Sequence, residues 1–314
     1  MDFYEALSAR AVPVNIEPSK TSYFSKPEVG LDPRLFRDGK LIPAVRNSVL
    51  TVLFNYLSSL YQGPNDWTFA WLAGSGVSHQ WAAKRLPGDL DCLVGIDYEA
   101  FRRANTKFTG LSNQEIASMF NEGFRNDLWP LTDNFMDVFE LTFYVNVQTD
   151  IAKIKPYAAY SLITDDWLVQ PTIEEAPTDP AWNRKVEKDK SKTADIIARY
   201  ATALTHIKQA PNTAMRVNAE RALRMAVKQA SELYEEIHKG RKYAFSESGA
   251  GYLDYANYRW QAGKESGIVQ ALGKLKEIAD MSDRDFAAST YGVELPDVST
   301  LIRRAATRLS LIHI

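Results

Sequence analysis

The chain has 314 residues, 45% of them hydrophobic and 24% charged, so it can form one large globular domain or two ordinary ones. Its single cysteine, Cys92, excludes an internal disulfide, and its 4 histidines do not have the spacing of zinc ligands. The first residues contain no signal-type apolar segment, and no run approaches the ~18 apolar residues of a membrane span. We therefore expect a cytoplasmic protein that does not associate with a membrane.

The formal net charge of −2 favours no class of partner, but the charge is unevenly distributed. Residues 184–314 contain 22 Lys and Arg against 16 Asp and Glu, whereas residues 1–183 contain 15 against 23. An acidic first half and a basic second half suit a polyanionic ligand that both halves contact. A chance imbalance on solvated helices explains the same numbers, and the sequence leaves both interpretations open.

The first half of the chain alternates between helical and extended patterns. Residues 1–40 are rich in Pro, Gly and Ser and have no sustained period, which predicts an irregular arm. Ser112 and Glu115 have the spacing of a capping box, which marks the start of a helix. The expected helices are 43–61 and 112–127, and the expected strands are 67–73, 91–96, 138–147, 157–163 and 166–171. These elements predict a small mixed sheet with helices, of class α+β, in a domain that spans residues 41–175.

The second half of the chain is dominated by helical periodicity. Prolines in residues 171–183 predict a linker, and residues 184–314 are expected to form an α-helical domain. The expected helices are 196–207, 219–237 (ended by Gly240), 254–262, 267–280 and 297–309. The segment 240–260, dense in aromatic and basic residues, is either a packed interhelical loop or a surface on which a base stacks.

Gly74-Ser75-Gly76 directly follows the strand expected at 67–73, and a short helical pattern comes after it. Small residues at such a position let backbone N–H groups approach a phosphate, and the start of a helix adds a favourable dipole. Most triplets of this kind are ordinary turns, so the triplet alone does not identify a binding site.

A pair of aspartates, Asp89 and Asp91, follows shortly afterwards. In a strand both project from one face, while Leu90 projects from the other. Two adjacent carboxylates repel each other unless a cation or donor neutralises them, and Mg²⁺ is commonly bound by one or two carboxylates plus substrate phosphates. The pattern suits a Mg²⁺ site, with Mn²⁺ as the alternative ion, but the triplet alone is more typical of a solvated strand start.

A third acid is expected on a neighbouring strand, and Glu140 fits this position. It shares one face of its strand with Thr142, while Phe139 and Leu141 fill the opposite face. We therefore predict Glu140 as the third carboxylate. The alternative is Asp137, at the edge of the same strand.

The order of these motifs resembles the DNA polymerase β-type nucleotidyltransferase superfamily. The similarity covers roughly residues 43–170: a strand ending in Gly-Ser, a short helix, a strand with Asp-x-Asp, and an acid within a later apolar strand. The resemblance implies that Gly74 and Ser75 bind the triphosphate of a nucleotide, and that Asp89, Asp91 and Glu140 bind two Mg²⁺ ions and carry the catalysis. The family usually has Asp at the third position, and the 13 residues between Ser75 and Asp89 are towards the long end of its range.

The activity implied by the resemblance is transfer of a nucleoside monophosphate from a nucleoside triphosphate, such as ATP, to an acceptor hydroxyl, with release of pyrophosphate. The acceptor could be RNA, another nucleotide, a protein side chain or a small molecule. Lys84 and Arg85, just before the aspartates, either contact phosphates or form a solvated turn. A catalytically silent protein that keeps the fold and binds nucleotides or nucleic acid is the alternative.

Overall fold

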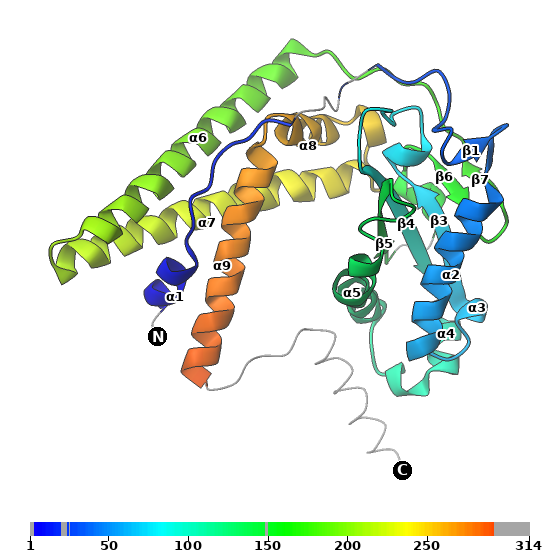
Figure 1. Ribbon diagram of the computed structural model, residues 1–314, viewed down its shortest axis with the longest axis horizontal. Helices are drawn as coiled ribbons and strands as arrows, with labels where there is room; N and C mark the ends of the chain where they lie inside the picture. The colour runs from blue at the N-terminus through cyan, green and yellow to red at the C-terminus, as the bar shows by residue number, and fades with distance from the viewer. Residues whose placement is uncertain (1–2, 20–23, 25, 148–149, 292–314) are drawn as a thin grey trace. The chain divides into compact units, whose positions relative to one another are not determined.

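The computed structural model describes residues 3–19, 24, 26–147 and 150–291 (Figure 1). Within these residues the chain forms two compact units. The sheet unit contains residues 26–147 and 150–175, and the helical unit contains residues 3–19, 24 and 176–291. Among the described residues, no helix combines the length and the apolar character needed to span a bilayer.

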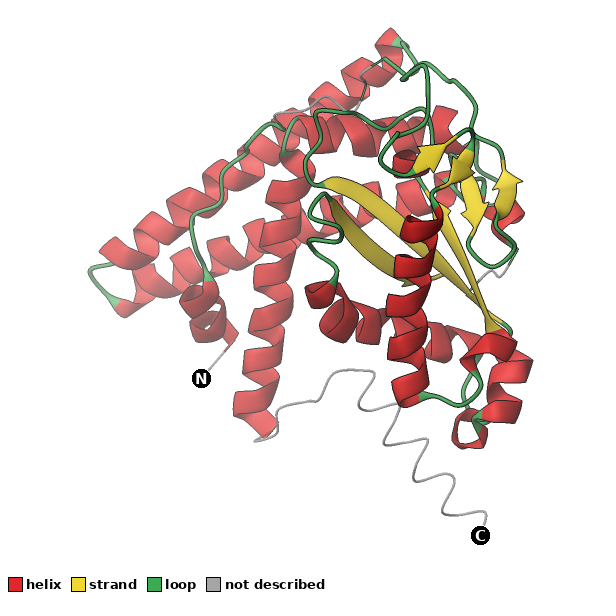
Figure 2. Ribbon diagram, turned by 45° about the vertical axis from the view of Figure 1, so that its right-hand side comes forward, coloured by secondary structure: helices red, strands yellow, loops and turns green. Residues whose placement is uncertain are grey.

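A five-stranded mixed sheet forms the centre of the sheet unit (Figure 2), with the strand order β5-β4-β3-β6-β7. The strands are β3 (Thr68–Ala73), β4 (Gly88–Ile96), β5 (Phe139–Val145), β6 (Ala159–Ser161) and β7 (Asp166–Val169). β4 and β5 are parallel, and the other neighbouring strands are antiparallel. All five expected strands are present, and the predicted α+β class is confirmed.

Helices cover one face of this sheet. They are α2 (Pro43–Leu60), α3 (Pro64–Trp67), α4 (Tyr98–Ala104) and α5 (Asn113–Gly123). Leu53 and Leu57 of α2 share a core with Leu72 of β3 and with Leu90 and Cys92 of β4. Full burial of each such aliphatic side chain stabilises the fold by about 1.5–3 kcal/mol relative to exposure. Side chains alternate along a strand, so the residues on either side of the buried Leu90, Asp89 and Asp91, project from the opposite face of β4.

Several elements of the sheet unit have boundaries other than those expected, and two of the differences bear on the site. β4 begins at Gly88 rather than at residue 91, because the Gly88 N–H donates to the Val138 carbonyl (2.9 Å) and pairing with β5 starts there. The helix expected over 112–127 is α5 followed by a π-helical turn, Phe124–Leu128. The predicted capping box at its start is confirmed by reciprocal hydrogen bonds between Ser112 and Glu115.

Residues 1–40, expected to be an irregular arm, contain regular structure. Phe3–Arg10 form helix α1, and the side chain of Leu7 is buried in the core of the helical unit. With 8 residues, α1 is too short to leave a sustained period in the sequence. Further along, β1 (Phe36–Arg37) and β2 (Lys40–Leu41) form a two-residue hairpin.

Four long helices and α1 form the helical unit. They are α6 (Pro180–Gln209), α7 (Thr213–Ala244), α8 (Tyr255–Glu265) and α9 (Ile268–Tyr291). α6 and α7 are joined by a three-residue turn and pack along each other (Figure 1). Their shared core includes Ile196 and Tyr200 of α6, Leu223 and Leu233 of α7, and Leu272 of α9.

The helices of this unit extend beyond the ranges expected from the sequence; α9, for example, ends at Tyr291 rather than at residue 280. Gly240 lies inside α7 and does not end it; a Cβ there would lie 3.4 Å from the Cβ of Ala256, an ordinary van der Waals contact with α8. α6 begins inside the linker expected at 171–183, because the Asp179 side chain accepts a hydrogen bond from the Ala181 N–H (2.7 Å) and caps the helix. The helix expected at 297–309 lies outside the described residues.

Candidate active site

Two parallel strands bring the predicted carboxylates onto one face of the sheet. In the register of β4 and β5, Asp89 is the partner of Glu140 and Asp91 is the partner of Thr142. Neighbouring strands lie ~4.8 Å apart, so these four residues form a compact polar group. The opposite face of both strands is buried, as at Leu90. The prediction that Asp89 and Asp91 share a face, with Glu140 beside them on a neighbouring strand, is confirmed.

Asp91 connects this polar group to the Gly-Ser motif. The Thr142 hydroxyl donates a hydrogen bond to Asp91 Oδ1 (3.0 Å). On the other side, Asp91 is the register partner of Ala73 at the end of β3, and a Cβ added to Gly74 would lie 2.8 Å from Asp91 Oδ2. The carboxylate therefore lies between a hydroxyl of β5 and the backbone of the predicted phosphate-binding turn.

The backbone of the Gly74-Ser75-Gly76 turn requires both of its glycines. Gly74 has φ 82° and ψ −162°, a conformation that is essentially restricted to glycine. A Cβ on Gly76 would lie only 2.5 Å from the carbonyl oxygen of Asp89, so the turn packs directly against β4. The short helix expected after the motif is a single 3₁₀ turn, Ser75–Val77. Anion binding here would therefore depend on individual backbone N–H groups rather than on the dipole of a long helix.

Replacing Gly74 by alanine is expected to lower both stability and nucleotide affinity. The strained backbone should destabilise the protein by about 1–3 kcal/mol, and the new methyl group should displace the Asp91 carboxylate. Urea unfolding and a nucleotide titration measure the two effects. Gly30→Ala is the matched control, because a Cβ there meets nothing within 4 Å. Wild-type nucleotide affinity in Gly74→Ala would contradict a phosphate-binding role for this turn.

Arg85 forms an ion pair with Asp89, in which its Nη2 donates to Asp89 Oδ2. The Arg85 side chain is 20% exposed and that of Asp89 37% exposed, so the pair is partly shielded from solvent. Lys84 beside it is exposed. Of the two basic residues singled out in the sequence, Arg85 forms an ion pair with a predicted site residue. The sequence signal for this contact is the acid, Asp89, four residues after Arg85.

The two candidates for the third carboxylate lie in different environments. Glu140 is half-buried within β5, and the indole N–H of Trp129 donates to its Oε1 (3.2 Å). Asp137 lies in the turn before β5, with φ 60°, is exposed, and accepts from Asn134 Nδ2 (3.3 Å). Glu140 therefore shares the face of the two aspartates, while Asp137 does not belong to the strand. No sequence pattern pointed to Trp129, which follows a π-helical turn.

The donor set fits a divalent cation in part. Two carboxylates and a neighbouring hydroxyl are the oxygen ligands that Mg²⁺ takes when substrate phosphates complete its shell. Within the described part of the chain, however, no three His, Cys, Asp or Glu side chains form a group that could hold a metal ion. Asp89 contacts Arg85 and Glu140 contacts Trp129 in this arrangement. The paired aspartates fit the ion, and the role of Glu140 as a third ligand stays a prediction.

Cys92 lies in the core directly behind the two aspartates. Burial and the nearby charge of Asp91 raise the pKa of its thiol, so it is protonated at neutral pH. A buried protonated thiol is neither a nucleophile nor a metal ligand. Cys92 therefore belongs to the packing beneath the site.

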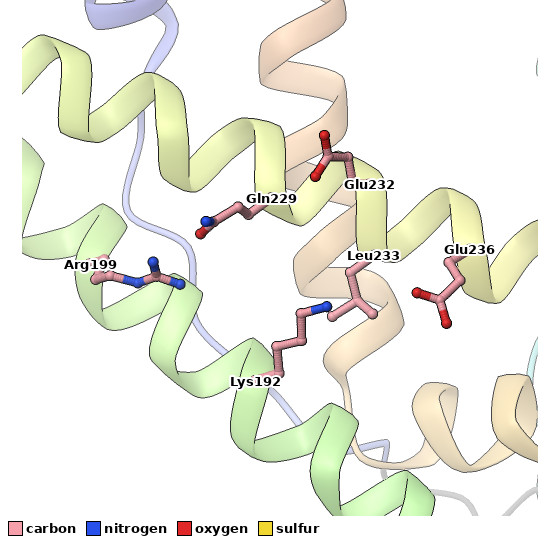
Figure 3. A pocket seen from close by; sticks show the side chains of 6 residues that line it. All are labelled: Lys192, Arg199, Gln229, Glu232, Leu233 and Glu236. Atoms are coloured by element: carbon pink, nitrogen blue, oxygen red, sulfur yellow. The ribbon is translucent and has the colours of Figure 1, made fainter.

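Three basic residues of the helical unit have surroundings of their own within that unit. Lys190 pairs with Glu187 (2.7 Å), and the Arg241 guanidinium lies 5.1 Å from the centre of the Trp260 ring. Lys192 lines a cavity of about 340 Å³ between α6 and α7 (Figure 3). The other residues that line it are Arg199, Gln229, Glu232, Leu233 and Glu236. With two bases and two acids, this cavity has no excess positive charge to favour a polyanion.

No family model, curated protein or solved structure matches the chain. The functional interpretation is therefore carried by the geometry of the sheet unit.

Proposed function

We propose that this chain is a nucleotidyltransferase that transfers a nucleoside monophosphate from a nucleoside triphosphate to an acceptor hydroxyl. The observation that carries the proposal is the position of Asp91, in hydrogen-bond contact with Thr142 and against the glycine-only turn at Gly74. Two paired acids beside a turn with glycine on both sides of Ser75 suit a metal–triphosphate ligand. The Asp-x-Asp and Gly-Ser motifs, separate in the sequence, lie next to each other in the sheet unit.

In this proposal each residue has a distinct task. The backbone at Gly74 and Ser75 binds the triphosphate, and Thr142 orients the Asp91 carboxylate by donating to its Oδ1. Asp89 and Asp91 would hold Mg²⁺ or Mn²⁺, which when bound supplies charge stabilisation to the phosphates and activates the attacking hydroxyl. Positioning and electrostatics dominate such transfers.

Glu140 would act as the general base. The acceptor oxygen forms a bond to the α-phosphorus, the bond from that phosphorus to the bridging oxygen breaks, and pyrophosphate leaves. The proton of the acceptor hydroxyl passes to the Glu140 carboxylate. The Trp129 N–H holds this carboxylate in place by donating a hydrogen bond to its Oε1. ATP is the first nucleotide to test, RNA or a second nucleotide the first acceptor, and a cytoplasmic location is part of the proposal.

A second candidate is a catalytically silent nucleotide-binding protein with the same fold. The ion pair between Arg85 and Asp89 favours it, because it neutralises one carboxylate without a metal ion. Among the described residues, no three acidic, histidine or cysteine side chains are arranged as the ligands of one metal ion, and this points the same way.

Pyrophosphate release and label transfer separate the two candidates. The full chain is incubated with α-³²P-labelled nucleoside triphosphates, Mg²⁺ or Mn²⁺, and either an RNA oligonucleotide or unlabelled nucleotides. We expect pyrophosphate to appear in proportion to labelled product. Saturable ATP binding with no pyrophosphate under any of these conditions would favour the silent protein.

A further inference from the structure

The contact between Arg85 and Asp89 gives this site an internal cation. Two carboxylates on one strand face repel each other, and each needs a partner when no metal ion is bound. The Thr142 hydroxyl donates a hydrogen bond to Asp91. Asp89 forms an ion pair with the positively charged guanidinium of Arg85. The guanidinium therefore binds Asp89 Oδ2, an oxygen of one of the carboxylates that would hold the proposed metal ion.

Asp89 links Arg85 to the predicted phosphate-binding turn. Asp89 contacts the guanidinium with its side chain, and its carbonyl oxygen lies 2.5 Å from where a Cβ of Gly76 would stand. Asp91, whose Oδ2 lies 2.8 Å from where a Cβ of Gly74 would stand, projects from the same face of β4 as Asp89, so an anion on this turn would face the strand surface that carries the Arg85 guanidinium. Arginine is suited to this task, because its planar fork donates two parallel hydrogen bonds to phosphate.

We propose that Arg85 is the internal counterion of Asp89 in the nucleotide-free protein and moves to the triphosphate when the nucleotide binds. The inference extends the proposed nucleotidyltransferase function and depends on it. Arg85 has opposite effects on two ligands: it competes with a metal ion for Asp89, and it adds a charged donor for the triphosphate. Metal ions alone therefore bind weakly, and metal and triphosphate bind together.

The two effects can be measured without any acceptor or turnover. The first measurement is the affinity for Mn²⁺ alone, from the electron paramagnetic resonance signal of the free ion. The second is the calorimetric affinity for inorganic tripolyphosphate with Mg²⁺, which removes the unknown base from the comparison. Both use the full chain as wild type, Arg85→Ala and Arg85→Lys. Arg103→Ala is the control, because Arg103 forms an exposed pair with Glu99 at the same spacing elsewhere in the sheet unit.

Arg85→Ala should bind Mn²⁺ about two- to fivefold more tightly, the range set by a weakly buried ion pair. It should bind tripolyphosphate about tenfold or more weakly, as expected for loss of a charge-assisted hydrogen bond. Arg85→Lys keeps the charge but not the fork, so it should bind Mn²⁺ like wild type and tripolyphosphate with intermediate affinity. Arg103→Ala should change neither.

Unchanged affinities for both ligands in Arg85→Ala, or parallel losses of both, would overturn the inference and make the ion pair structural. If Arg85→Ala does not fold, Arg85→Lys decides, because wild-type tripolyphosphate affinity in that variant also contradicts it. Asp91→Asn distinguishes this failure from failure of the proposed function. Wild-type Mn²⁺ affinity in Asp91→Asn refutes the metal site itself, whereas lost Mn²⁺ binding there with no effect of Arg85→Ala refutes only the role of Arg85.

Discussion

Asp91→Asn is expected to abolish nucleotide transfer while the protein remains folded. The substitution keeps the shape of the side chain and its hydrogen bond from Thr142, but removes the charge that a metal ion needs. Because one of two repelling carboxylates becomes neutral, the free energy of unfolding should be unchanged or slightly higher. Pyrophosphate release and thermal unfolding of the same preparation measure both quantities.

Asp133→Asn is the control for this experiment. Asp133 is an exposed aspartate, so the substitution removes the same charge. It lies in the loop before β5 and is not part of the paired register of β4 and β5. This variant should keep wild-type turnover. Near-normal turnover in Asp91→Asn would show that the metal assignment on β4 is wrong.

Glu140→Gln is expected to lower the turnover number by ~10²–10⁴-fold, the range for loss of a general base. Glutamine can still accept from the Trp129 N–H, so the local packing should survive. The comparison is Asp137→Asn, which changes an exposed side chain in the turn before β5 and should have a mild effect. Single-turnover kinetics at saturating nucleotide measure the chemical step in both variants.

The ranking of these two variants decides the third carboxylate. A large loss in Asp137→Asn with little change in Glu140→Gln would move the base to Asp137. That result would require the turn before β5 to rearrange on nucleotide binding, because Asp137 is outside the strand register that pairs Glu140 with Asp89.

Local patterns predicted the elements that form this site. Alternation placed Asp89 and Asp91 on one strand face, and the capping box fixed the start of α5 at Ser112. The apolar neighbours of Glu140 put it on the partly open face of β5. Each of these features depends on residues within a few positions of one another, so a single sequence contains the information.

Contacts between distant segments were not predictable in the same way. The parallel register that sets Glu140 beside Asp89 depends on a crossover of more than 40 residues, and the Trp129 hydrogen bond depends on where a π-helical turn ends. α1 was missed because it is short and is stabilised by packing of Leu7 against distant helices. Gly240 was interpreted as a helix end, although α7 continues to Ala244.

The most direct test of a metal–nucleotide site on β4 is anomalous diffraction from crystals of the full chain soaked with Mn²⁺ and a nonhydrolysable ATP analogue. We predict a Mn²⁺ peak bonded to carboxylate oxygens of Asp89 and Asp91, with the triphosphate against the backbone of Gly74 and Ser75. The Arg85 guanidinium should then contact the triphosphate rather than Asp89. A bound analogue whose triphosphate and Mn²⁺ lie away from these aspartates would contradict the proposed function.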